Sequence, residues 1–311
     1  SIAASAVVPA SLGGSARIEA SDAAIRVLAT SADAATAKAF GTSISGLGLS
    51  ILKVVATSAG ATYATVGAGA EINAQSLRLE ASSSSSPAAR LESVGVGLLL
   101  SDTIASAEST DTHQVEAAIG AGAVVTTSAG VTVSAEGTNE ARADSVLGAG
   151  GLGTGIFFQA IVTVTPEFRA TIGAGANVTA GGDVLVQAES RRATANAAAR
   201  AVSVGAVGVG DIFSEATLSP RVFSQIGDNA VVKAGGRVEV LANILAKTEY
   251  SGPALTDFFQ PSVAVNPDDD SIYFVSHGLG AGDRVTYAPD PADPADAALL
   301  DSDRDYRGIV I

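Results

Sequence analysis

The chain lacks whole classes of side chain. Its 311 residues include no Cys, no Met and no Trp, and aromatic residues make up only 5%. Without Cys, the chain can form neither a disulfide framework nor a thiolate nucleophile. Ala and Gly dominate the composition, and a core of such small residues is thin. These absences favour closely stacked backbone layers over a bulky globular centre.

Histidine is almost absent as well. The chain contains two His residues, and neither stands near a recurring Ser or Asp in the sequence, so a nucleophilic triad is not expected. His113 takes a place that other copies of the repeat described below fill with Gly60, Pro166 and Pro220, which indicates a corner of the chain. His277 lies in a hairpin-like His-Gly-Leu segment, which indicates a turn or capping role. We therefore expect no enzyme activity and no cofactor.

Basic residues are also few. Lys and Arg number 18 against 32 Asp and Glu, a formal net charge of −14. Nucleic acid is excluded as a partner, because phosphate binding needs clustered Lys and Arg. The longest uncharged stretch, residues 145–166, reaches the length of a membrane-spanning helix, but the equivalent stretches of neighbouring repeats carry Asp102 and Asp211. We therefore expect no membrane span.

A segment that returns at a fixed interval organises the first part of the chain. The copies begin at Gly67, Gly120, Gly173 and Gly227 and read GAGAEINAQSLRLEA, GAGAVVTTSAGVTVSA, GAGANVTAGGDVLVQA and GDNAVVKAGGRVEVLA. A regular period of about 53 to 54 residues indicates stacked units that share one core. A frayed copy without the leading Gly spans Ala6 to Ala20. Together with the absence of Met, this copy predicts that the chain is a piece of something longer.

Alternation with a period of two predicts strands inside each repeat. In the third copy Val178, Ala180, Val184, Val186 and Ala188 share one face, and the intervening residues share the other. The second half of each repeat alternates too, with runs such as Ala141, Ala143 and Ser145. Ala has the best helix propensity, but the Gly interruptions and the β-branched residues that follow favour strand.

Corners between the strands carry glycine. Four Gly residues open the copies, and two Gly pairs divide the strands of the later copies, where we expect positive φ angles at sharp turns. The residues expected to shape these structural turns are Gly67, Gly120, Gly173, Gly227, Gly181, Gly182, Gly235 and Gly236. The half-repeat of about 26 residues suits one coil, so the sequence predicts an all-β solenoid with about two coils per repeat. Eight to ten such coils would make a rod roughly 40 Å long.

The composition changes near residue 250. All 13 Glu lie at or before Glu249, whereas 11 of the 19 Asp lie after it, with four of the five Tyr and six of the ten Pro. We therefore expect a β-solenoid repeat array over residues 1–249 and a small β-rich module over residues 250–311.

Two stretches carry a resemblance to a known family. IGAGANVTAGGDVLVQAES, from Ile172 to Ser190, resembles the repeat arrays of filamentous-haemagglutinin-like and leukotoxin-type filamentous adhesins of bacteria. HGLGAGDRVTYAPD, from His277 to Asp290, is similar to a module that punctuates such arrays. The resemblance covers roughly residues 1–245 and part of the tail. It implies a right-handed β-helical shaft that is secreted or displayed on the bacterial cell surface, and it carries over no catalytic or ligand residue.

Acidic clusters in the tail are the candidate metal ligands. Asp268 and Asp270, and the spaced set Asp301, Asp303 and Asp305, offer the oxygen ligands that Ca²⁺ prefers. The spaced set lacks the Gly and the closing Glu of an EF-hand loop. Solvated loop acids are the alternative interpretation.

The residues kept between copies face inward, and the outward columns drift in residue type, as in Glu71, Val124, Asn177 and Val231. This pattern predicts a non-enzymatic shaft or spacer of a large extracellular adhesin, whose host or matrix surface is bound by other parts of the protein. The alternative is a self-assembling filament or matrix protein, with or without a need for Ca²⁺, whose copies associate end to end or side by side. A carbohydrate-active β-helix enzyme is a third possibility, but it needs clustered acids and bases on one face.

Overall fold

The computed structural model describes residues 1–245, 265–266, 271–272, 284–285 and 306–307. Strands and the short turns between them make up these residues, and no helix occurs among them. The chain divides into two compact units, Ser1–Ser251 and Gly252–Ile311. Ala-rich segments such as Val184–Leu218 are strands, so the all-β prediction is confirmed for the described residues.

Strands of neighbouring repeats pair in parallel and in register. Val131 pairs with Val184, its equivalent one repeat further along the chain, and Glu167 pairs with Arg221 in the same way. Every pair of strands in the first unit joins one repeat to the next. The prediction of about two coils per repeat is therefore wrong. Each repeat supplies a single layer, because its two halves lie in the same layer and do not pair with each other.

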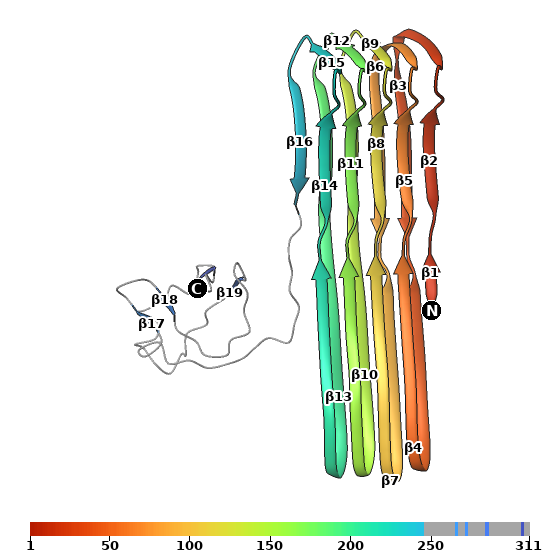
Figure 1. Cartoon of the computed structure of the whole chain (residues 1–311), viewed down its shortest axis with the longest axis vertical. Helices are drawn as coiled ribbons and strands as arrows, with labels where there is room; N and C mark the ends of the chain where they lie inside the picture. Colours follow the sequence, from red (N-terminus) through yellow and green to blue (C-terminus); the bar gives the residue numbers. More distant parts are fainter. Residues whose placement is uncertain (246–264, 267–270, 273–283, 286–305, 308–311) are drawn as a thin grey trace. The chain divides into compact units, whose positions relative to one another are not determined.

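One layer is a long, flattened loop of chain. In the third layer, β8 (Gln114–Ile119) leads through a corner into β9 (Val124–Thr127). The long strand β10 (Val131–Val164) then runs away from that corner and returns, and β11 (Glu167–Ile172) begins the next layer. Figure 1 shows these loops side by side, with the strands along the longest axis of the picture.

The other layers repeat this order. Their strands are β1 (Ile2–Ala4), β2 (Val7–Leu12), β3 (Arg17–Asp33), β4 (Thr36–Ser58), β5 (Ala61–Val66), β6 (Glu71–Ser85), β7 (Ala88–Asp111), β12 (Asn177–Ala180), β13 (Val184–Leu218), β14 (Arg221–Ile226), β15 (Val231–Ala234) and β16 (Val238–Ile244). The second unit contains two antiparallel pairs, β17 (Val265–Asn266) with β18 (Ser271–Ile272), and β19 (Arg284–Val285) with β20 (Tyr306–Arg307).

The uncharged stretch of residues 145–166 lies almost entirely within β10. Within the described part of the chain, no helix has the length and apolar character needed to cross a membrane.

The stack is shallower than predicted. The sheet formed by β2, β5, β8, β11 and β14 has five strands, one for each layer. At about 4.8 Å between neighbouring strands, five layers span roughly 20 Å, about half of the predicted rod length. The prediction counted each half-repeat as a coil. Each layer is correspondingly wider, because the whole repeat spreads across it.

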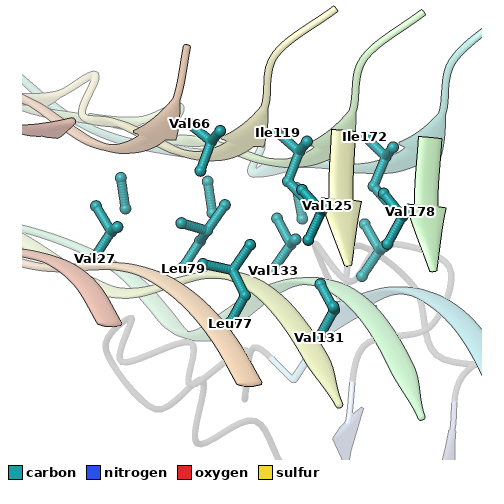
Figure 2. Close-up of a cluster of buried hydrophobic side chains, with 14 of the residues drawn as sticks. Val27, Val66, Leu77, Leu79, Ile119, Val125, Val131, Val133, Ile172 and Val178 are labelled. Carbon is teal, nitrogen blue, oxygen red and sulfur yellow. The ribbon is translucent and has the colours of Figure 1, made fainter. Parts of the chain in front are cut away.

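The face assignments are confirmed. Val178, Val184, Val186 and Ala188 are fully buried, and the alternate residues point outward. One buried cluster lies between the strands β5, β8 and β11 and the strands that face them. Figure 2 shows Val66, Ile119 and Ile172 on one side of this cluster and Leu79 and Val133 on the other. A second cluster fills the space between the two halves of β4, β7 and β10, with Ala-rich columns.

The glycines that open the copies allow neighbouring layers to approach closely. A Cβ added to Gly120 would lie 2.5 Å from the backbone N of Ala68, and one added to Gly173 would lie 2.6 Å from the N of Ala121. Gly67 and Gly227 meet the preceding layer in the same way. The hydrogen bond from the N–H of Gly120 to the carbonyl of Val66, at 2.8 Å, keeps the ladder intact through the corner.

The Gly pairs have a different role from the predicted one. Gly181, Gly182, Gly235 and Gly236 do not have positive φ angles. Their corners approach the layer before them, and a Cβ on Gly181 would lie 2.2 Å from the carbonyl oxygen of Ser128. Positive φ occurs instead in the column of Ser15, Gly69, Gly122, Gly175 and Asn229. Steric contact between layers therefore explains the pairs, and the left-handed turn lies elsewhere in the repeat.

This contact can be tested by Gly120→Ala. The added methyl group overlaps the backbone of the layer below, so we expect a loss of roughly 1–3 kcal/mol in the free energy of unfolding by urea. Gly148→Ala is the matched control, because its Cβ would meet only Val94 at 3.7 Å. Its unfolding free energy should change by less than about 0.5 kcal/mol. Equal effects of the two substitutions would contradict the account.

Candidate functional site

The sequence-predicted metal ligands cannot be placed. Asp268, Asp270, Asp301, Asp303 and Asp305 all lie outside the described residues. Within the described part, no group of three or more His, Cys, Asp or Glu side chains is arranged to hold a metal ion. The eight predicted turn glycines lie at the layer corners described above.

A buried polar cluster around His113 is the most unusual arrangement in the first unit. His113 lies at the break between β7 and β8, as expected of a corner, but its side chain is completely buried. Its Nδ1 lies 3.1 Å from Oδ2 of Asp33 in β3. Its Nε2 lies 3.2 Å from the hydroxyl of Ser31 in β3 and 3.1 Å from the hydroxyl of Thr62 in β5. The imidazole therefore connects two strands, β3 and β5, to the break between β7 and β8.

This contact corrects the expectation that His113 has no Ser or Asp nearby. Ser31 and Asp33 lie two residues apart on β3, and the stacking of layers brings His113 to them, although Ser31 and His113 are 82 residues apart in the sequence. The types are those of a nucleophilic triad. A catalytic Ser has to reach a substrate, and Ser31 and His113 are both buried in the interior, so the geometry gives no support to hydrolysis.

Gly60 provides the space that the imidazole occupies. A Cβ on Gly60 would lie 2.4 Å from Cε1 of His113 and 2.3 Å from Oδ2 of Asp33. In the following layers, Pro166 and Pro220 stand at the corresponding strand breaks. Proline has no N–H for a ladder, so it suits a break. Gly, His, Pro and Pro thus occupy the strand break of successive layers. The break in the strand is common to all four, and only His113 places a ring in the interior.

Asp111 extends the cluster to two further strands. Its Oδ2 accepts a hydrogen bond of 2.9 Å from the Nδ2 of Asn139 in β10, and its Oδ1 accepts one of 3.2 Å from the backbone N–H of His113. Next to it, the hydroxyl of Ser85 donates to Ser58 at 2.8 Å. All of these side chains are buried. The cluster is therefore a continuous polar band across the interior, between the two apolar clusters.

The band becomes apolar along the stack. Asp111 pairs with Ser58 on one side and with Val164 on the other, and Asn139 pairs with Ser85 and then with Ala193. Thr62 pairs with Val115, whose next partner is Phe168. These three columns thus become Val, Ala and Phe in the later layers, whereas the column of Ser31 continues through Ser83 and Gly137 to the buried Ser190.

Burial shifts the proton affinities in this band. It raises the pKa of Asp111 above 3.8, even though hydrogen bonds from Asn139 and the His113 N–H act in the opposite direction. It lowers the pKa of His113 below 6.5, against the attraction of Asp33 and Asp111. In both groups the cost of burying the charged form has a larger effect on the pKa than the hydrogen bonds and charges of the neighbouring residues. The band therefore favours an uncharged imidazole and resists ionisation of Asp111.

Some atoms of the band are left without a hydrogen bond. Nδ1 of His113 and Oδ2 of Asp33 are close in space but not aligned for one, and Oδ1 of Asn139 is also unpartnered. A buried polar group without a partner costs about 1–3 kcal/mol. The unpartnered atoms of the band thus lower the stability of the fold locally. Such a cost is unusual, because other layers fill several of these positions with apolar residues.

The outer surface carries ion pairs between residues two apart on a strand. Arg142 and Asp144 form one pair, as do Arg78 and Glu80 at 2.8 Å. A shallow hollow over β5, β8 and β11 is lined by Tyr63, Glu116 and Arg169, among others. Arg169 pairs with Glu167 and also lies 5.1 Å from the centre of the Phe223 ring. Arg169, the basic residue of the hollow, thus already has an ionic and an aromatic partner.

Sequence reasoning missed the polar band. The signal was present, since Ser, Thr, Asp and Asn stand at inward positions in the alternation, for example at Asp33, Asp111 and Asn139. The layer spacing was needed to recognise that these positions meet.

No known family profile, curated protein or solved structure matches the chain.

The hydrogen bond between Asn139 and Asp111 can be tested by Asn139→Ala. The substitution removes the donor to a buried carboxyl group, so the free energy of unfolding should fall by about 1–3 kcal/mol. Asn73→Ala is the control, because Asn73 is exposed on β6 and its loss should cost less than about 0.5 kcal/mol. Urea unfolding at neutral pH measures both. An Asn139→Ala variant as stable as the parent would contradict the network.

Proposed function

We propose that residues 1–249 form the shaft of a large secreted or cell-surface bacterial adhesin or filament, built as a right-handed β-solenoid without enzymatic activity. Its role is mechanical, because it holds other parts of the protein away from the surface that carries it. The observation that carries the proposal is the contrast between inward and outward columns of the stack.

Inward columns of the two apolar clusters keep their residue type from layer to layer. Leu12, Val66, Ile119, Ile172 and Ile226 are successive partners in one column. Each branched side chain packs on its equivalents above and below, and burying one contributes roughly 1.5–3 kcal/mol. Stability in such arrays is close to a sum over neighbouring layers. A shaft requires this property, because every added repeat then supports itself.

Outward columns show no such constancy. Arg78, Thr132, Leu185 and Glu239 are successive partners, and Tyr63, Glu116, Arg169 and Phe223 form another such column. A substrate groove would repeat or cluster one chemistry along a face, whereas these columns change charge and size at each layer. A varied exterior over a uniform interior supports a spacer.

The geometry also indicates what kind of shaft this is. One whole repeat lengthens the stack by only about 4.8 Å. Reach therefore requires many residues, and the width of each layer supplies resistance to bending. The location outside the cell rests on the resemblance of Ile172–Ser190 and His277–Asp290 to filamentous adhesins.

The alternative is a self-assembling extracellular filament or matrix protein, with Ca²⁺ bound by the acidic tail. One observation favours it. The end strands of the five-stranded sheet, β2 and β14, each pair on one side only. Core residues of the last layer, such as Val222 and Val232, are only partly buried. Open strand edges of this kind are templates for another copy.

Removal of one repeat tests the shaft directly. Deletion of residues 120–172 joins Ile119 to Gly173 and recreates the natural Ile-Gly junction. We expect the variant to keep its β-sheet circular dichroism and to shorten by one layer, about 4.8 Å, in small-angle scattering. Loss of folded structure on removing a single layer would contradict a shaft built from self-supporting repeats.

Electron microscopy of the parent chain, with and without millimolar Ca²⁺, separates the two functions. Isolated particles in both conditions support the shaft. Fibres of uniform width support the filament, and fibres that form only with Ca²⁺ support its metal-dependent form.

A further inference from the structure

The His113 cluster has properties that a plain structural core does not need. The buried imidazole lies against the carboxyl group of Asp33 in β3, and Asp111 in β7 accepts a hydrogen bond from the backbone N–H of His113 and attracts a charge on the ring. Later layers fill the columns of Asp111, Thr62 and Asn139 with Val164, Phe168 and Ala193, so the fold itself does not require polar residues at these three positions. The residues of the cluster come from the first three of the five layers.

We propose that the His113 cluster is an acid-sensitive joint, which loosens the layers of β3 to β8 when the imidazole takes up a proton. The proposal concerns regulation of the stack and does not depend on the function proposed above.

The arrangement of donors and acceptors favours a neutral ring. The hydroxyl groups of Ser31 and Thr62 lie 2.7 Å from each other and within 3.2 Å of Nε2, so one can donate to the other while the second donates to the lone pair of Nε2. The remaining ring nitrogen, Nδ1, then carries the hydrogen and faces Asp33. A positive ring would need an aligned bond to its counter-ion to offset the loss of water. Nδ1 and Oδ2 of Asp33 are 3.1 Å apart but are not aligned for a hydrogen bond.

Among the described residues, the charged groups that act on the ring are the carboxyl groups of Asp33, at 3.1 Å from Nδ1, and of Asp111. The elements around it present Ser31 and Asp33 from β3, Gly60 and Thr62 at the start of β5, and Asp111 from the end of β7. Water is excluded as well, because the His113 side chain has no exposed surface. Uptake of a proton therefore places a charge where only local opening can hydrate it.

The sign of the pH dependence follows from the shifts. Because the pKa of His113 is lower in the folded chain, the unfolded chain binds more protons as the pH falls below 6.5. Stability that is complete above pH 6.5 is therefore lost as the pH falls toward the folded pKa. Asp111 acts in the opposite direction, because its raised pKa lets the folded chain bind a proton first as the pH falls toward 3.8. Asp111 thus limits the loss at the acid end.

The ring can be observed directly, because the chain contains only two His residues. In His277→Gln, the nitrogen resonances of the remaining imidazole report the state of His113. We expect a neutral ring with hydrogen on Nδ1 at pH 7, and no half-protonated state at pH 6.5 in the folded chain. A ring protonated on both nitrogens at pH 7, or one that titrates at the ordinary value, would overturn the proposal without requiring any variant of the cluster.

Amide hydrogen exchange, corrected for the intrinsic rate, tests the consequence. In the parent chain, the opening of β5 and β8 should increase between pH 7 and pH 5, by up to about tenfold for each pH unit below 6.5. The opening of β14 should increase much less over the same range. His113→Asn removes the titrating ring and should make the opening of β5 and β8 independent of pH in this range. His277→Gln should retain the parent behaviour. Unchanged pH dependence in His113→Asn, or equal loosening of β14, would overturn the joint.

Discussion

Register between layers is the constraint on which the rest of the structure depends. Each residue of a repeat pairs with its equivalent in the next repeat, from Thr36 and Ala88 to Val184 and Val238. Whatever side chain stands at a position must therefore pack on the same position of the next layer. Small or branched residues satisfy this rule inside, and glycine satisfies it at corners where a Cβ would meet the backbone below. The same rule leaves the outer positions free to vary.

The sequence alone was enough to predict much of this fold. Alternation identified the strands and their faces, and the columns that begin with Glu71 and Arg78 are the pairs found in the structure. The number of layers was wrong, because both halves of the repeat alternate and periodicity cannot tell two stacked coils from two halves of one. The predicted positive φ at Gly181 and Gly235 failed for a similar reason. Gly allows both an unusual φ and a close approach, and only the neighbouring layer shows which is used.

The polar band illustrates what the chain sequence hides. Asp33 looks unrelated to Asp111 and His113 along the chain, since it comes from an earlier repeat. The stack brings them together, and because they are buried, their charges and hydrogen bonds affect stability rather than solubility. A band of this kind makes one end of an otherwise uniform array chemically distinct. The mechanical role and the acid response that we propose are compatible, because stability is local to neighbouring layers.

The account rests on one layer for each repeat, and spin labelling tests this claim most directly. The absence of Cys allows pairs of labels to be placed without removing native thiols. Labels at Thr132 and Leu185, which are in-register partners on neighbouring strands, should show strong dipolar broadening. Labels at Thr132 and Gln159, half a repeat apart, should show much less. Strong broadening in the second pair and weak broadening in the first would contradict the account.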